Sequence, residues 1–317
     1  MRIGIAVGDV RGPVSPDDLV GQVRAVASAG LAQAWVAQAF AWDALVGITV
    51  AGAHVPGVGL GTAIVPTPQR HPLVLASQAL SVQAATGNRL TLGIGTGIAS
   101  MVGPMFGLPT DRPARRMREY LSVLRPLLQG KEVAHRSETL TAVGVVHVPE
   151  AAPPPVLLAA LSPAMLRIAG ELTDGAVTWM TGPKTLAGHV MPALAAAAST
   201  SDRSALRLVA GVLVCVTDDE TGVRQRLSRD FGLAGQVPEY RAVLDREGAA
   251  GPADVAVVGD EDAVTRGLRR YGDAGVTDLM AAPYGSPAEQ ARTLAVLADL
   301  ASSSRGGAHA GMQLAPQ

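Results

Sequence analysis

The segment from Val58 to Gly97 constrains the fold most, because it reads as two strands joined by a helix. The apolar run VGLGTAIV at 58–65 is typical of a strand buried in a parallel sheet. A proline-rich loop and an apolar helical pattern that ends at Gly87 follow it. The second strand, Leu90–Ile94, runs into closely spaced glycines, which let a ligand approach the backbone. The segment therefore predicts a βαβ unit with a ligand site at its C-terminal tip.

The same alternation of strands and helices continues along most of the 317 residues. We expect eight strands, at 2–7, 34–37, 58–65, 90–94, 156–160, 175–180, 206–216 and 277–281. Eight such units favour an α/β fold of the (β/α)8 TIM barrel type over an open doubly wound sheet. We predict one barrel domain over residues 1–300, with an excursion near 131–152. The Ser/Gly/Ala-rich segment 301–317 is predicted to be a disordered tail.

Composition excludes several classes of protein. The formal net charge of -1 gives no basic footprint for nucleic acid. No apolar run reaches the length of a membrane span, and no signal peptide is visible, so we expect a cytoplasmic protein. The single cysteine, Cys215, excludes an internal disulfide framework. His135 and His147 match no metal spacing, and no metal site is predicted.

In a barrel of this kind, chemistry gathers where the strands end. Ser162 and Pro163 open a helix after the fifth strand, so backbone N–H groups there favour an anion. Several residues at other strand ends are expected to line a substrate pocket. They are Asp9, Trp42, Ile98, Met105 and Phe106, the last two as an apolar lid or as core packing under the loop.

Six segments, in this order and spacing, resemble the luciferase-like monooxygenase superfamily. They are AWVAQAFAWDAL, GLGTAIVPTPQRHP, NRLTLGIG, MFGLPTDRPARRMREYLSVLRPLL, PPPVLLAALSPAMLRIAGELTDGAVTWMTGP and REGAAGPADVAVVGDEDAV. More narrowly, the chain is similar to the actinobacterial branch of oxidoreductases that depend on the deazaflavin coenzyme F420. The resemblance covers nearly the whole chain, to about Leu300.

The resemblance implies a barrel that holds a flavin or deazaflavin at its C-terminal mouth. It also implies a bulge on the third strand, with a cis peptide bond at Ala63–Ile64 that supports the tricyclic ring. Phosphate contacts are implied from the loops after strands four and five, and further contacts from the exit of strand six. The implied cofactor-binding residues are Gln38, Ala63, Ile64, Gly95, Thr96, Gly97, Ala160, Leu161, Ser162, Met180, Thr181 and Gly182.

One departure from the family pattern concerns proton supply. Members of this branch often read GIGLSHQ where the chain reads GIGTGIA, so Gly97 and Ile98 replace a Ser-His pair. Many members carry Asp or His at the end of strand two, where this chain has Gln38, which does not titrate near neutral pH. The remaining candidates for the catalytic proton are water held by Gln38, His71, Tyr284 or bulk water, with a structural role in its loop as the alternative for His71.

The resemblance implies an enzyme that uses reduced F420 as hydride donor to a small or modified-peptide substrate. Its relatives in natural-product biosynthesis favour reduction of an activated C=C or C=N bond. Two alternatives remain at this point: an FMN-dependent monooxygenase on the same barrel, or a cofactor-binding homologue that has lost catalysis. Barrels of this family commonly pair through helices near strands two and three, and the Ala-rich helix predicted at 43–53 suits a homodimer.

Overall fold

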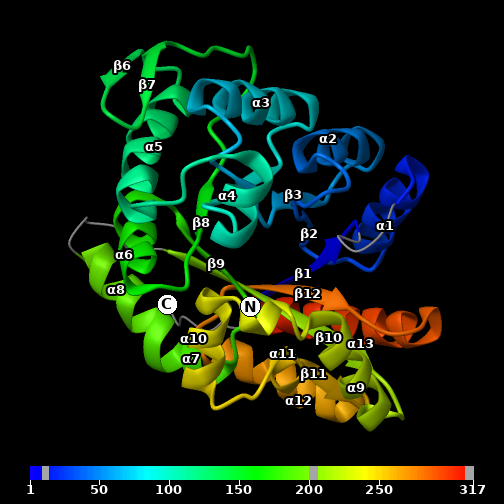
Figure 1. Ribbon diagram of the computed structural model, residues 1–317. Helices are drawn as coiled ribbons and strands as arrows, with labels where there is room; N and C mark the ends of the chain where they lie inside the picture. Colours follow the sequence, from blue (N-terminus) through cyan, green and yellow to red (C-terminus); the bar gives the residue numbers. More distant parts are fainter. Residues whose placement is uncertain (9–13, 200–205, 311–317) are drawn as a thin grey trace, which may run out of the picture.

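A closed parallel barrel forms the centre of the computed structural model, which describes residues 1–8, 14–199 and 206–310 (Figure 1). Eight strands make the barrel within these residues: β1 (Arg2–Val7), β2 (Gln33–Val36), β3 (Gly59–Thr62), β5 (Leu90–Gly95), β8 (Val156–Ala159), β9 (Gly175–Trp179), β10 (Arg207–Val216) and β12 (Asp278–Pro283). Each strand pairs in parallel with its neighbours, and the pairing of β9 with β10 closes the ring. The predicted TIM barrel is confirmed.

Helices surround the strands. They are α1 (Pro16–Ser28), α2 (Ala44–His54), α3 (Pro72–Ala85), α5 (Pro113–Leu128), α6 (Pro163–Leu172), α7 (Pro183–Thr185) running through a π-helical turn into α8 (Met191–Ser199), α12 (Glu261–Asp273) and α13 (Pro287–Ala310). Side chains cap many of their first turns, as Ser15 does for α1 and Asp43 for α2. Helices α3 and α6 begin with a proline. Proline lacks a backbone N–H, but in the first turn of a helix that N–H would have no acceptor within the helix, so nothing is lost.

Large apolar side chains fill the barrel interior. They fit because glycines on the neighbouring strands have no side chain in the same space. A Cβ atom at Gly4 would lie 2.8 Å from Trp35 Nε1, and one at Gly61 would overlap the same indole ring. Across the barrel, a Cβ at Gly211 would overlap Trp179. The interior is therefore a packed core, and open space for a ligand lies only at its ends.

The N-terminal end of the barrel is closed by a buried polar network. Arg207 pairs with Asp278 at 2.9 Å and donates further hydrogen bonds to Thr91 and Gln33. Asp278, whose side chain is only 5% exposed, also accepts from Arg2. These polar side chains occupy the N-terminal end of the barrel, and in barrels of this architecture the active site lies at the opposite, C-terminal end.

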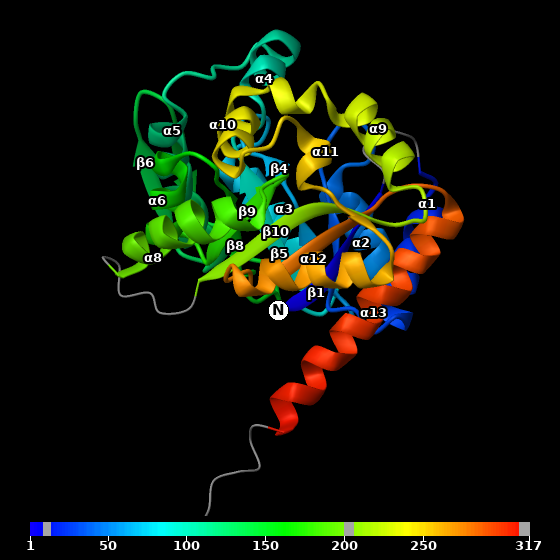
Figure 2. The ribbon, with the colours of Figure 1, turned by 90° about the horizontal axis from the view of Figure 1, so that it is seen from below.

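Four elements that the sequence did not predict lie between the barrel units. They are the second strand segment β4 (Val65–Pro66), helix α4 (Ala99–Phe106), helix α11 (Pro252–Val255) and strand β11 (Val257–Gly259), which pairs with the end of β10. Figure 2 shows α4, α9 (Glu220–Phe231), α10 (Pro238–Glu247) and α11 gathered at one end of the barrel. The insertions therefore build the walls of the mouth.

The structure also describes two regions outside the barrel that the sequence predicted, the excursion near 131–152 and the C-terminal segment. The excursion near 131–152 contains an antiparallel hairpin of β6 (Val133–Arg136) and β7 (Thr141–Gly144), which packs on α5 and α3. The closing helix, predicted to end at Leu300, runs on to Ala310, so the first part of the predicted tail is helical. The last seven positions, 311–317, lie outside the described residues.

Candidate functional site

A bulge in the third strand shapes one side of the barrel mouth. Against β5, the three residues Thr62–Ile64 stand opposite only two, Leu92 and Gly93, so one residue is extra. The Ala63–Ile64 peptide bond is cis, as predicted. The Thr62 hydroxyl donates to the Gly93 carbonyl at 2.7 Å and accepts from the Gly93 N–H at 2.8 Å. This side chain therefore holds the interrupted ladder together.

The end of β5 lies directly beside the bulge. A Cβ atom on Gly95 would lie 3.0 Å from Ile64 Cδ1 and 3.0 Å from the Ala159 methyl group of β8. The structure therefore brings the bulge and the tips of β5 and β8 together, as the sequence predicted. Because Gly95 has no side chain, Ile64 and Ala159 can pack closely over it.

The loop after β8 leads into the first turn of α6, beside the tips of β5 and β8. Ala160 is buried and donates its N–H to Val177 at 3.2 Å, whereas Ser162 is exposed and caps α6 by accepting from the Met165 N–H at 3.3 Å. The positive end of the α6 dipole faces the loop at 160–162. This is an arrangement that suits a phosphate or carboxylate.

The tip of β9 is closed, in contrast to the prediction that it lines the cofactor. Met180 is 3% exposed and packs on Leu244 and Val255 of α10 and α11. Thr181 is buried and donates to the Trp179 carbonyl. A Cβ atom on Gly182 would overlap the carboxyl group of Glu247. Sequence reasoning missed α10 as the cover, because no local signal places a helix sixty residues away on this tip.

Gln38 lies at the end of β2, next to the bulge. Its backbone N–H donates to the Ile64 carbonyl at 3.1 Å, and its side chain is partly buried. The Gln38 Oε1 atom accepts from the Ala44 N–H at 2.8 Å and from Arg70 Nη2 at 3.2 Å. Arg70 also forms an ion pair with Asp43, the cap of α2. Gln38 is thus held at the mouth by its own neighbours.

The other two predicted proton donors are engaged by protein groups. His71 caps α3 by accepting from the Leu73 N–H at 3.3 Å, and its Nε2 donates to the Thr141 carbonyl at 2.8 Å. The Tyr284 hydroxyl donates to Asp230 at 2.7 Å, and the ring packs edge-on against Phe231. With both ring nitrogens occupied, His71 fits the structural alternative. Tyr284 is buried under α9 rather than presented to the mouth.

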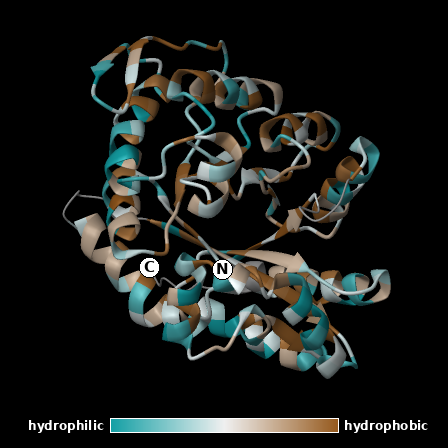
Figure 3. Ribbon diagram, in the orientation of Figure 1, coloured by the Kyte–Doolittle hydropathy of each residue, from teal (hydrophilic) through white to brown (hydrophobic). Residues whose placement is uncertain are grey.

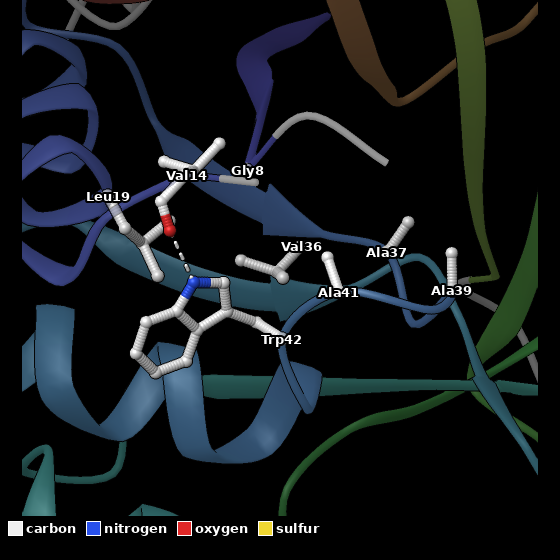
Figure 4. A pocket seen from close by; sticks show the side chains of 8 residues that line it. All are labelled: Gly8, Val14, Leu19, Val36, Ala37, Ala39, Ala41 and Trp42. Carbon is white, nitrogen blue, oxygen red and sulfur yellow. Dashed lines mark hydrogen bonds between the residues drawn. The ribbon is translucent and has the colours of Figure 1, made fainter. Parts of the chain in front are cut away.

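Trp42 lines a small hollow at the C-terminal ends of β1 and β2 (Figure 4). Its indole N–H donates to the Val14 carbonyl at 2.7 Å. The hollow, bounded also by Gly8, Leu19 and Ala37, encloses about 10 Å³, which is room for about one water molecule. Of the other predicted pocket residues, Asp9 lies outside the described residues.

Helix α4 carries exposed apolar side chains over the mouth. It begins after Ile98 and ends at Gly107, and Val102 is its one buried residue. Met105 and Phe106 are 59% and 47% exposed. Their exposure fits the predicted apolar lid better than core packing under the loop.

The described residues hold no cluster of three or more His, Cys, Asp or Glu side chains arranged to bind a metal ion. Nor do they include a helix that is both long and apolar enough to cross a membrane.

The fold and the mouth define a closed (β/α)8 barrel with a bulged third strand and a helix N-terminus at the C-terminal ends of its strands. A family model described as luciferase-like monooxygenase matches residues 1–303. The chain therefore belongs to the luciferase-like monooxygenase family.

Relatives and solved structures agree with this family. An uncharacterized protein of Mycobacterium tuberculosis is 30% identical over 229 residues, which is 68% of this chain and 67% of that protein. A second protein of the same organism, named as a coenzyme F420-dependent oxidoreductase, is 26% identical and covers 94% of this chain and 99% of its own length. The F420-dependent tetrahydromethanopterin reductase of Methanopyrus kandleri has the same fold, with a TM-score of 0.79, 19% identity and coverage of 96% of this chain and 99% of that one.

Proposed function

We propose that this protein is an F420-dependent oxidoreductase, which transfers a hydride between C5 of the deazaflavin and a small or peptide-like substrate. The observation that carries the proposal is the convergence of the Ala63–Ile64 bulge, Gly95 and the α6 N-terminus at one mouth of the barrel. The relative named as an F420-dependent oxidoreductase, matched over nearly its whole length, supports the same cofactor.

The residues present fit a tricyclic ring with a phosphate tail. The ring would rest on the bulge, where Ile64 packs closely against Gly95 and a Cβ atom on Gly95 would stand 3.0 Å from both Ile64 and Ala159. The apolar side chains of Ile64 and Trp179 would exclude water from its face. The phosphate would lie at residues 160–162, at the start of α6. Thr96, Gly97 and Leu161 complete the proposed contacts, whereas Met180, Thr181 and Gly182 are proposed only as support beneath them.

When bound in reduced form, F420 supplies a hydride to an electrophilic carbon. The protein orients that carbon and excludes water. We propose that the substrate carries an activated C=C or C=N bond, as the family resemblance implies. Because His71 and Tyr284 are engaged elsewhere, the proton that follows the hydride is proposed to come from water at the mouth.

A cofactor titration tests the proposal. Purified protein is titrated with oxidised F420 and, separately, with FMN, and binding is followed by absorbance and fluorescence. We expect F420 to bind and reduced F420 to be consumed with a panel of activated alkenes and imines. Tight binding of FMN alone would instead support the FMN-dependent monooxygenase. Binding of F420 without turnover of any panel member would support a homologue that has lost catalysis.

We further propose that the protein is cytoplasmic and that it is a homodimer that pairs through α2 and α3. These two helices are in contact with each other, and most of their residues are apolar, as the brown parts of their ribbons show (Figure 3). Val46 and Val74 on them are 53% and 50% exposed. Light scattering during size-exclusion chromatography tests this, because V46E combined with V74E should convert a dimer into a monomer. A wild-type monomer would contradict the proposal.

A further inference from the structure

We propose that Arg70 is a positioning residue: it fixes the side-chain amide of Gln38 so that only the Nε2–H2 group is available to a ligand at the mouth. The inference rests on the proposed function for the identity of that ligand, which we take to be a carbonyl oxygen on the cofactor ring. The orientation of the amide rests on the protein alone.

The chemistry of its partners sets the orientation of the Gln38 amide. Its Oε1 atom accepts from the Ala44 N–H at 2.8 Å and from Arg70 Nη2 at 3.2 Å. A backbone N–H and a guanidinium are both donors only. If the amide rotated by half a turn, its NH2 group would face two donors and lose both hydrogen bonds. Arg70 and Ala44 therefore allow one orientation of the amide.

Arg70 is itself held by Asp43 and by Tyr120. It forms an ion pair with Asp43, and the side chains of the two are 12% and 34% exposed. The Arg70 carbonyl accepts from the Tyr120 hydroxyl of α5 at 2.9 Å. Asp43 in turn caps α2 by accepting from two backbone N–H groups. Because a guanidinium presents several donors in a rigid plane, Arg70 can serve Asp43 and Gln38 together.

The opposite end of the Gln38 amide has no partner among the residues that the structure describes. Its Nε2 atom makes no hydrogen bond to any described residue, and the side chain is partly exposed at the C-terminal end of β2. The Gln38 backbone is bonded to Ile64 of the bulge, where the ring is proposed to rest. An amide NH2 donates a hydrogen bond but releases no proton near neutral pH. Gln38 would therefore recognise an acceptor and stabilise negative charge on it, without serving as the acid.

A cofactor-free experiment tests the role of Arg70 first. The side-chain amides of glutamine are observed by 15N NMR in the full-length protein, and the Gln38 signal is identified by its absence in Q38E. We expect this signal to shift in R70M. The control is R89M, because Arg89 is another partly buried arginine but donates to the backbone carbonyls of Gly52, Val55, Val58 and Thr86 and not to Gln38. A Gln38 signal that R70M leaves unchanged, or that R89M moves equally, would overturn the inference.

The second arm adds oxidised F420, and separately FMN, to each variant. We expect the cofactor that binds the wild type to shift the Gln38 signal, and R70M and Q38E to bind it about 2- to 10-fold more weakly, the range of one lost hydrogen bond. R89M should bind it as the wild type does. Binding seen by fluorescence without any shift of the Gln38 signal would show that Gln38 does not face the ring. If neither cofactor binds, the proposed function fails, and the comparison of R70M with R89M still decides whether Arg70 positions Gln38.

Discussion

Glu247 packs its carboxyl group directly against Gly182, at the N-terminus of the helix that follows β9. The carboxylate accepts hydrogen bonds from the backbone N–H groups of Thr185 at 2.7 Å and Lys184 at 3.2 Å. It thus occupies the place that an anion would take at a helix N-terminus. The protein fills this end with its own carboxylate, so the start of α6 is the better position for the phosphate of a cofactor.

Removal of this cap should destabilise the protein. In E247A, the N–H groups of Thr185 and Lys184 lose their acceptor, which should lower the free energy of unfolding by about 1–3 kcal/mol. E247Q keeps an acceptor oxygen and should lose less. Urea denaturation followed by circular dichroism measures the difference. Equal stability of E247A and the wild type would show that the contact contributes nothing.

The buried ion pair at the floor of the barrel should be one of the most sensitive positions. D278N leaves the Arg207 charge without its partner in a buried setting, so the free energy of unfolding should fall by about 3–5 kcal/mol. R207M should also be destabilised, because Asp278 then loses its more buried cation and keeps only Arg2, whose side chain is 56% exposed. Denaturant titrations of both variants check this. A loss of less than 1 kcal/mol in both would show that the network at this end is dispensable.

The same pair should give the protein an acid-dependent stability. Burial alone would raise the pKa of Asp278, but the hydrogen bond and charge of Arg207, with hydrogen bonds from Thr277 and Arg2, hold that pKa below its ordinary value. A carboxyl group whose pKa is lower in the folded state stabilises that state fully at pH values above its unfolded-state pKa, about 3.9. This contribution to the free energy of unfolding is lost as the pH falls through the folded-state pKa. Between pH 5 and pH 3, the wild type should therefore lose more stability than D278N. Parallel losses would contradict this source of acid sensitivity.

The bulge should tolerate no side chain at Gly93. A Cβ atom there would overlap the Thr62 carbonyl oxygen, so G93A should cost about 1–3 kcal/mol through overpacking and should weaken binding of F420. The matched control is G21A in α1, where a Cβ meets no atom within 4 Å. Alanine favours a helix over glycine by about 0.5–1 kcal/mol, so G21A should raise stability slightly. Thermal melts and a cofactor titration of both variants test the pair.

Much of the fold was predictable because local signals and tertiary structure agree. The eight strands follow from short apolar runs, and α6 and α10 have the predicted bounds because proline begins each of them. The cis bond at Ala63–Ile64 came only from the family resemblance, since nothing in those two residue types requires it. Helix α4 was not predicted, because Gly103 and Pro104 weaken its helical pattern.

The site was harder to predict than the fold, because its residues are positioned by distant ones. His71 and Tyr284 looked available as proton donors, but Thr141 and Asp230, each more than fifty residues away along the chain, engage them. The closed tip at Met180 depends on Leu244 and Glu247 in the same way. A single sequence shows the types of these residues but not the contacts that decide which of them remain free.

The loop after β5 explains why a Ser-His pair is absent here, and predicts what happens when it is installed. Gly97 adopts a φ of +69°, and a Cβ atom on it would lie 2.8 Å from Val102 of α4. G97S should therefore lower the free energy of unfolding by about 1–2 kcal/mol, the cost of a left-handed conformation for a residue with a side chain. I98H is the matched control, because Ile98 has extended backbone that any residue adopts, and it should keep wild-type stability. Urea denaturation compares the two. Equal stability of G97S and I98H would show that the loop relaxes to accept serine. It would also show that the backbone conformation of residue 97, which leads into α4, does not require glycine.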